Sequence, residues 1–154
     1  MRKITPCLWF DGNAEEAVNF YASVFKDARI LDAQRYGPGA PLPEGTVLTM
    51  NFELFGQGFM ALNGGPEFKF DEAVSFIVDC ESQEEVDYYW ERLTAGGGEE
   101  GMCGWLKDKF GLSWQITPRR LSELLAHPDR DKAARVLQAM LQMRKIDVRA
   151  LEEA

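Results

Sequence analysis

The chain has 154 residues, of which 45% are hydrophobic and 27% are charged, and its formal net charge is −8. This length and composition are typical of one globular domain with a buried core. The acidic balance argues against nucleic acid as a partner, because phosphate binding needs clustered Lys and Arg, and against anionic membrane surfaces.

Neither a secretion signal nor a membrane span is expected. Residues 1–3 precede a short strand-like run and not an apolar signal segment, and no apolar stretch approaches the roughly 20 residues that span a bilayer. The cysteines Cys7, Cys80 and Cys103 are odd in number and have no CxxC spacing. We therefore expect free thiols in a soluble, cytoplasmic protein.

In chain order, the first 120 residues contain a weak internal repeat. The pair Phe10-Asp11 precedes a helical pattern, and Val78-Asp79 precedes a second one, with Asp11 and Asp79 68 residues apart. Further on, Phe55-Gly56 resembles Phe110-Gly111 at an offset of 55. We expect two copies of a strand–helix–three-strand module, covering about 1–66 and 67–120, within one domain spanning 1–120.

Eight strands are expected from the alternation of apolar and polar residues. Their ranges are 4–10, 28–36, 47–54 and 58–63 in the first module, and 73–80, about 98–101, 102–107 and 112–117 in the second. Glycines make the segment 98–101 a short or irregular strand. The order of elements is therefore βαβββ, repeated once.

The two predicted helices have capping-box spacing at their starts, Asn13 with Glu16 and Ser82 with Glu85. Gly96–Gly98 are expected to end the second helix. The apolar stripes that should face the core are Ala17, Val18, Tyr21, Val24 and Phe25 in the first helix, and Val86, Tyr89, Trp90 and Leu93 in the second.

Residues 121–154 are predicted to form a helical C-terminal extension. Pro128 suits the first turn of a helix, and Asp129 and Asp131 favour its positive end. Asp147 is a candidate cap for a last short helix at 148–153. The apolar stripe of the extension consists of Ala133, Val136, Leu137, Met140 and Leu141. It could pack on the sheet of its own chain or on a partner subunit.

Three long segments carry a resemblance to a known family. They are FDGNAEEAVNFYASVF, ALNGGPEFKF and CGWLKDKFGLSWQITP, and the ending HPDRDKAARVLQAMLQMRKIDVRALEEA is also similar. The chain resembles the PhnB-like, demethylubiquinone methyltransferase-type domains of the vicinal oxygen chelate (glyoxalase, bleomycin resistance and dioxygenase) superfamily. The resemblance implies an α+β fold of two βαβββ modules, with curved mixed sheets, helices on the outer face, an enclosed pocket and a homodimer.

The resemblance also implies positions for a metal, at the first and last strands of each module in the metal-dependent members. The matching residues are Thr5, Met60, Ala73 and Gln115. Only Gln115 is a plausible ligand, and one neutral amide does not hold a metal ion. We therefore expect no metal and no cofactor, and we expect the single histidine, His127, in a surface loop.

Strand alternation places Leu8, Phe10, Phe76 and Val78 under the helices and their neighbours on the concave face. Asn63 begins a turn that could form a flexible rim. The candidate ligand-pocket residues are Thr5, Cys7, Trp9, Asn63, Ser75, Cys103, Trp105, Lys107 and Gln115. The alternatives are core packing for Trp9 and Trp105, an inert buried thiol for Cys103, and a solvated turn for Lys107-Asp108.

Two classes of function fit these residues. A binding protein needs only a shaped, aromatic pocket for a small molecule. An enzyme acting on a small metabolite, of lyase, isomerase or methyltransferase type, would need a general acid or base, and the nearby candidates are Glu53, Cys103 and Lys107. Methyl transfer is suggested by the family label alone, because no strand is followed by a Gly-rich turn of the dinucleotide- or adenosyl-binding type.

Overall fold

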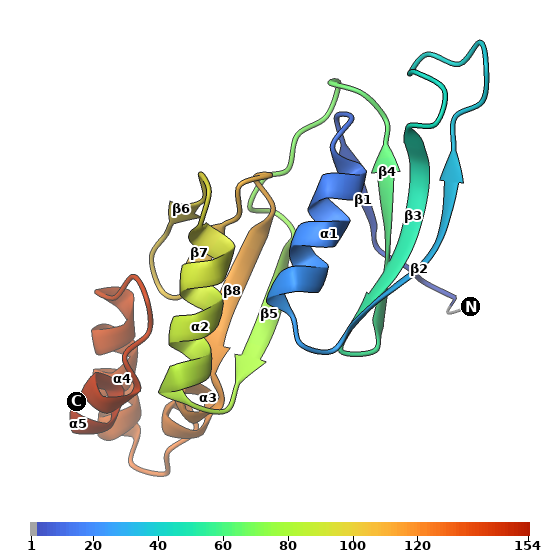
Figure 1. Ribbon diagram of the computed structural model, residues 1–154. Coiled ribbons are helices and arrows are strands. Elements are labelled where there is room, and N and C mark those ends of the chain that lie inside the picture. Colours follow the sequence, from blue (N-terminus) through green and yellow to red (C-terminus); the bar gives the residue numbers. More distant parts are fainter. Residues whose placement is uncertain (1–2) are drawn as a thin grey trace. The chain divides into compact units, whose positions relative to one another are not determined.

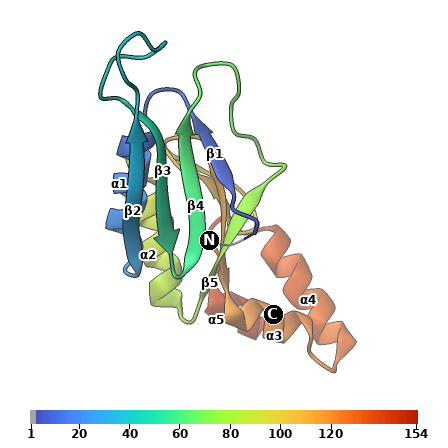
Figure 2. The ribbon, with the colours of Figure 1, turned by 90° about the vertical axis from the view of Figure 1, so that its right-hand side faces the viewer.

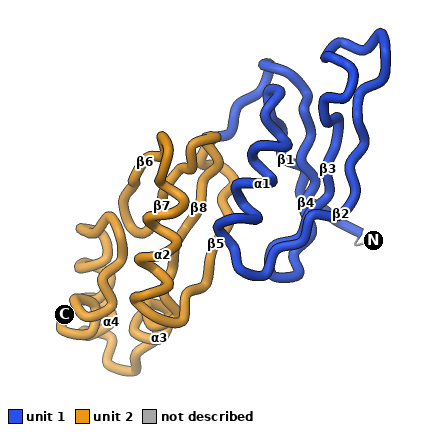
Figure 3. Tube along the Cα trace, viewed as in Figure 1, with its two compact units in different colours: residues 1–70 blue, residues 71–154 orange. Residues whose placement is uncertain are grey.

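The computed structural model describes residues 3–154, which form two compact units, one ending at Phe70 and the other spanning Asp71–Ala154 (Figure 3). Each unit contains one four-stranded mixed sheet with a helix on one face, in the order βαβββ (Figure 1). The α+β fold and the repeated module predicted from the sequence are confirmed. None of the helices within residues 3–154 combines the length and the apolar character of a membrane span.

The first unit has a sheet in the order β1-β4-β3-β2, in which β1 is parallel to β4 and the other pairs are antiparallel (Figure 2). Its elements are β1 (Cys7–Phe10), α1 (Ala14–Val24), β2 (Ala28–Arg35), β3 (Val47–Leu54) and β4 (Gln57–Asn63). Leu8 and Phe10 are buried, whereas Cys7 is exposed and Trp9 is half-buried. This alternation agrees with the predicted facing of the first strand.

The apolar stripe predicted for α1 is buried throughout, but the start of the helix differs from the prediction. Asn13 makes no side-chain capping hydrogen bond. The side chain of Asn63, at the end of β4, takes that role, because its Oδ1 accepts a hydrogen bond of 2.9 Å from the backbone N–H of Ala14. The predicted capping box is therefore wrong, and a residue 49 positions away caps the helix.

The second unit repeats this arrangement, with the sheet order β5-β8-β7-β6 and β5 parallel to β8. Its elements are β5 (Ser75–Cys80), α2 (Gln83–Thr94), β6 (Glu99–Glu100), β7 (Trp105–Lys107) and β8 (Ser113–Pro118). Here the predicted cap is present, since Ser82 Oγ accepts a hydrogen bond of 3.2 Å from the backbone N–H of Glu85. The backbone N–H of Gly98 donates to Thr94 O at the end of α2, where Gly96 and Gly97 have positive φ.

Three strands begin two or three residues later than predicted, at Cys7, Ser75 and Trp105. The last difference has a clear cause, because residues before Trp105 form a turn in which Cys103 has a φ of 59°. The backbone N–H groups of Cys103 and Gly104 donate to the carbonyls of Met143 and Arg144 at 2.7 and 2.8 Å. These bonds to the C-terminal segment replace the strand pairing that the sequence pattern favours.

The C-terminal segment forms three helices, α3 (Arg119–Leu125), α4 (Arg130–Leu141) and α5 (Val148–Glu153). Helix α3 was not predicted, and α4 begins after Asp129, whose side chain caps it, and not at Pro128. Asp147 caps α5 as predicted, by accepting a hydrogen bond from the backbone N–H of Ala150. The buried residues of this helical cluster are Leu121, Leu124, Val136, Ile146 and Leu151.

The helical cluster is attached to the start of α2 in its own chain. The Gln83 side chain donates to Ile146 O at 2.9 Å and accepts from the backbone N–H of Val148 at 2.8 Å. The predicted stripe on α4 is divided: Val136 is fully buried in the cluster, whereas Leu137 and Leu141 are 41% and 44% exposed.

Candidate small-molecule pocket

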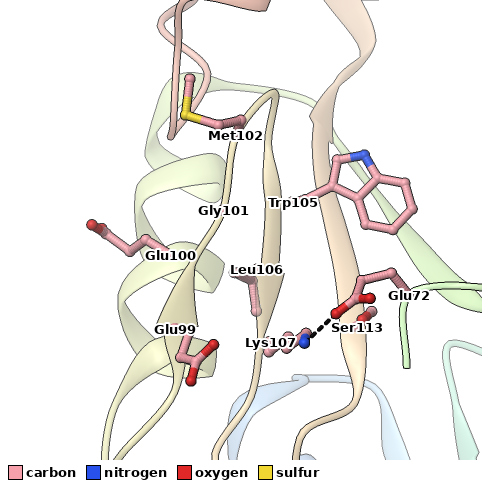
Figure 4. Close-up of a pocket in the computed structure, with 9 residues that line it drawn as sticks. All are labelled: Glu72, Glu99, Glu100, Gly101, Met102, Trp105, Leu106, Lys107 and Ser113. Atoms are coloured by element: carbon pink, nitrogen blue, oxygen red, sulfur yellow. Dashed lines mark ion pairs between the residues drawn. The ribbon is translucent and has the colours of Figure 1, made fainter. Parts of the chain in front are cut away.

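A cavity of about 420 Å³ lies beside β6 and β7 in the second unit (Figure 4). Its lining comes from β6, the turn before β7, β7 itself, the start of β8 and the segment before β5. The lining residues are Glu72, Glu99, Glu100, Gly101, Met102, Trp105, Leu106, Lys107 and Ser113. This volume lies within the range of sites for small organic molecules.

The register of β7 and β8 decides which side chains reach the open face. Trp105 lies opposite Gln115 and Lys107 opposite Ser113, while Leu106 lies opposite Trp114. Leu106 and Trp114 are 2% and 3% exposed on the face covered by α2. Alternation therefore places Trp105 and Lys107 on the face away from α2, together with Gln115, whereas the sequence alone left the face of Trp105 and Lys107 open.

The β7–β8 hairpin is held in shape by a buried carboxylate, that of Asp108, which is 2% exposed. Its Oδ1 accepts from the backbone N–H groups of Phe110 and Leu112 at 2.9 and 3.1 Å, and its Oδ2 accepts from Trp114 Nε1 at 2.9 Å. The interpretation of Lys107-Asp108 as a solvated pair is therefore wrong for Asp108. Its side chain instead organises the hairpin that carries Lys107 and Ser113.

Lys107 is paired with Glu72, as Figure 4 shows. The hydrogen bond that the Lys107 ammonium donates to the Glu72 carboxylate raises the pKa of Lys107 above its ordinary value, and the same bond lowers the pKa of Glu72. Glu99, opposite Lys107 in the β6–β7 register, adds to the electrostatic attraction. Lys107 therefore stays a protonated cation at neutral pH and is a poor general base.

Glu100 forms the wall of the cavity next to α2. Its Oε1 accepts a hydrogen bond of 2.5 Å from Trp90 Nε1, and its Oε2 lies 3.9 Å from Arg144 Nη1. These contacts connect the cavity wall to α2 and to the C-terminal segment.

Next to the cavity, a polar pair continues along the open face. Gln115 Nε2 donates a hydrogen bond of 2.9 Å to Ser75 Oγ, which joins β8 to β5. Both residues were candidates for the pocket, and they contact each other but do not line this cavity. Ile77, two residues after Ser75, is 65% exposed.

Two of the three cysteines, Cys7 and Cys80, have raised pKa values, and the third, Cys103, lies outside the cavity lining. Cys103 is half-buried in the turn before β7 and does not alternate with Trp105 in a strand. Burial raises the pKa of the Cys80 thiol to about 12 and also raises that of Cys7. Cys80 and Cys7 are therefore protonated thiols at neutral pH.

The remaining candidates lie in the first unit and form a separate group. Trp9 Nε1 donates to Gly65 O at 2.9 Å, and its indole ring lies only 2.4 Å from where a Cβ on Gly64 would be. Asn63, predicted on a rim, is instead buried, with its Nδ2 donating to Val47 O at 2.8 Å and its Oδ1 capping α1. Thr5 is exposed and precedes β1.

The four positions implied for a metal do not provide a suitable set of donors. Thr5 and Ala73 precede their strands, and Met60 and Gln115 contribute a thioether and a neutral amide. Within residues 3–154, no three His, Cys, Asp or Glu side chains are grouped so as to hold a metal ion. His127 Nδ1 accepts a hydrogen bond from the backbone N–H of Asp129, in the turn before α4.

We expect the purified protein to contain no stoichiometric Zn, Fe, Mn or Ni, and excess chelator to leave its melting temperature unchanged. The reason is the donor chemistry at Thr5, Met60, Ala73 and Gln115. Elemental analysis checks this expectation, and one tightly held metal per chain would contradict it.

Most residues that line the cavity are not among the pocket residues predicted from the sequence, which include only Trp105 and Lys107 of this lining. The missed residues are Glu72, Glu99, Glu100, Gly101, Met102, Leu106 and Ser113. Ser113 lies two residues before Gln115, so strand alternation predicts it on the same open face. A correct β6–β7 register would have placed Glu99 opposite Lys107. No local pattern marks Glu72, because it reaches Lys107 from a loop 35 residues earlier in the chain.

Comparisons with known proteins agree with this fold. The family described as 3-demethylubiquinone-9 3-methyltransferase matches residues 2–117. A solved structure of a PhnB protein from Bacillus cereus, described as a putative member of that methyltransferase class, is 40% identical, with a TM-score of 0.70 over 76% of this chain and 99% of that one.

More distant structures share the fold alone. A protein from Pseudomonas aeruginosa is 20% identical with a TM-score of 0.61, covering 77% of this chain and 98% of that one. The fosfomycin resistance protein FosX from Listeria monocytogenes is 16% identical with a TM-score of 0.55, covering 80% and 97%. No curated protein sequence matches the chain.

Proposed function

The chain belongs to the family described as 3-demethylubiquinone-9 3-methyltransferase, and we propose that it binds a small organic molecule without a metal. The observation that carries this proposal is the cavity in the second unit, whose lining includes Trp105, Met102 and the Lys107–Glu72 pair. We propose a cytoplasmic location, because Cys7, Cys80 and Cys103 are free thiols.

The protonation of Lys107 and the positions of Cys103 and Glu53, the three candidates for a general acid or base, favour binding over catalysis. Lys107 is held as a cation by Glu72, Cys103 lies in a turn outside the cavity lining, and Glu53 lies in the first unit, 3.8 Å from Arg29. A binding protein needs only shape and a few placed polar groups, which this cavity has.

Methyl transfer, which the family description names, receives no support from the glycine-rich segment. Gly96–Gly98 follow a helix and not a strand, and their conformations serve to end α2. A phosphate- or adenosyl-binding turn would instead connect a strand to the start of a helix. An enzyme acting on a small metabolite is the alternative to the binding function proposed here.

The pocket is tested with 4-phenylbutanol as a neutral aromatic probe. Replacing Trp105 with alanine should weaken its binding by about tenfold, because an aromatic contact and its buried area are both lost. Titration followed by calorimetry measures the effect, with Ile77→Ala as a control on an exposed apolar residue of the same unit. Unchanged affinity in Trp105→Ala, with the fold intact by circular dichroism, would remove this cavity as the binding site.

We also propose that the protein acts as a homodimer in which α4 takes part. Leu137 and Leu141 are one helical turn apart and exposed, and a second copy would remove both from water. Light scattering at micromolar concentration should give a dimer mass, and Leu137→Glu with Leu141→Glu should weaken association without destabilising the chain. A monomeric mass for the intact protein would contradict the dimer, whereas a dimer unaffected by both changes would exclude only α4.

A further inference from the structure

The charges around the cavity are unbalanced. Three carboxylates, those of Glu72, Glu99 and Glu100, line it with a single ammonium group, that of Lys107. Lys107 is already paired with Glu72, and Glu100 is engaged by Trp90 and Arg144. Within the described part of the chain, the Glu99 carboxylate makes no hydrogen bond or ion pair, so its charge is balanced only by the more distant Lys107.

The apolar part of the lining complements this negative charge. Trp105 is half-buried on the open face, and Met102, which is 47% exposed, lines the cavity from the turn before β7 (Figure 4). The face of an indole ring attracts cations through its quadrupole, and a thioether adapts to aromatic or aliphatic groups of varied shape. The cavity therefore provides a surface for an apolar group next to carboxylates for a cation.

We propose that this pocket selects ligands that carry a positively charged nitrogen next to an aromatic or aliphatic group. The inference rests on the proposed binding function and adds the ligand class. A bound ammonium would approach Glu99 with Trp105 covering the apolar part of the same molecule. Its charge would also be attracted by the chain as a whole, whose net charge is −8.

An anionic ligand is disfavoured for two physical reasons. A carboxylate or phosphate entering the cavity would have to displace Glu72 from Lys107 in order to reach a cation. It would also meet the charge of Glu99, which lies opposite Lys107 in the strand register. Like charges brought together in this way oppose binding, so the pocket discriminates by repulsion as well as by attraction.

Three probes of matched shape test the inference: 4-phenylbutylamine, 4-phenylbutanol and 4-phenylbutyrate, which are cationic, neutral and anionic at pH 7. Binding is followed by the indole N–H resonance of Trp105 in nitrogen-15 NMR, assigned with Trp105→Phe. We expect the amine to bind about tenfold or more tightly than the butyrate, with the alcohol between them. The preference should shrink as salt rises from about 10 mM to about 0.5 M, because exposed charges are screened.

Two variants separate the role of Glu99 from a general effect of charge. Glu99→Gln should weaken amine binding by about threefold to tenfold and change alcohol binding by less than about twofold. Glu91→Gln removes the same charge from an exposed residue of α2 outside the cavity lining, and it should change neither affinity.

The outcomes distinguish this inference from the proposed function. Equal binding of all three probes, a preference for the butyrate, or an unchanged amine affinity in Glu99→Gln would overturn the selectivity and leave the pocket in place. If none of the three probes shifts the Trp105 resonance, both the selectivity and the binding function proposed for this cavity are wrong.

Discussion

Replacing Asp108 with alanine is expected to lower the free energy of unfolding by about 3 kcal/mol. The change would leave the indole N–H of Trp114 and the backbone N–H groups of Phe110 and Leu112 without their acceptor. Two of these hydrogen bonds lie in buried surroundings, where water cannot replace the lost partner at no cost. Denaturation in urea, followed by far-ultraviolet circular dichroism, measures the loss.

The matched control is Asp27→Ala, which removes an exposed aspartate from the segment between α1 and β2. It should lower the free energy of unfolding by less than about 0.5 kcal/mol. Asp108→Asn should fall between the two variants, because one carbonyl oxygen still accepts hydrogen bonds but the charge is lost. If the free energy of unfolding of Asp108→Ala is within about 1 kcal/mol of that of the unmodified chain, the carboxylate does not stabilise the hairpin as described.

Replacing Leu151 with alanine is expected to lower the free energy of unfolding by about 3 kcal/mol, because the side chain is fully buried among the helices of the C-terminal cluster. Leu137→Ala provides a matched comparison, since Leu137 lies in the same set of helices but is 41% exposed. We expect Leu137→Ala to lower the free energy of unfolding of a single chain by less than about 1 kcal/mol, because the Leu137 side chain is only partly buried.

The same pair of variants tests whether the helical cluster unfolds with the rest of the second unit. The Gln83 side chain connects the cluster to α2 by hydrogen bonds to backbone groups of Ile146 and Val148, and the turn before β7 connects it to β7 by backbone–backbone hydrogen bonds. We therefore expect Leu151→Ala to shift one cooperative transition of that unit. A separate early transition, with the signals of Trp105 and Trp114 unchanged, would show that the cluster is an independent element.

The elements that the sequence alone determined share a local cause. The buried stripes of α1 and α2 follow from apolar spacing along one segment, and the caps at Ser82 and Asp147 join residues three positions apart. The exposure of Cys7 and the burial of Leu8 follow from the two-residue period of a strand, whereas the face that Trp105 takes became clear only from the β7–β8 register. The order of the modules could be predicted from residues repeated at fixed offsets.

What only the tertiary structure decided involves residues distant along the chain. Asn63 caps α1 because β4 ends beside it, and the turn at Cys103 forms because Met143 and Arg144 supply the carbonyls that its N–H groups need. Likewise, Glu72 reaches the cavity only when the segment before β5 lies next to β7. A buried polar group takes whichever partner the fold brings near, and no spacing pattern records that choice.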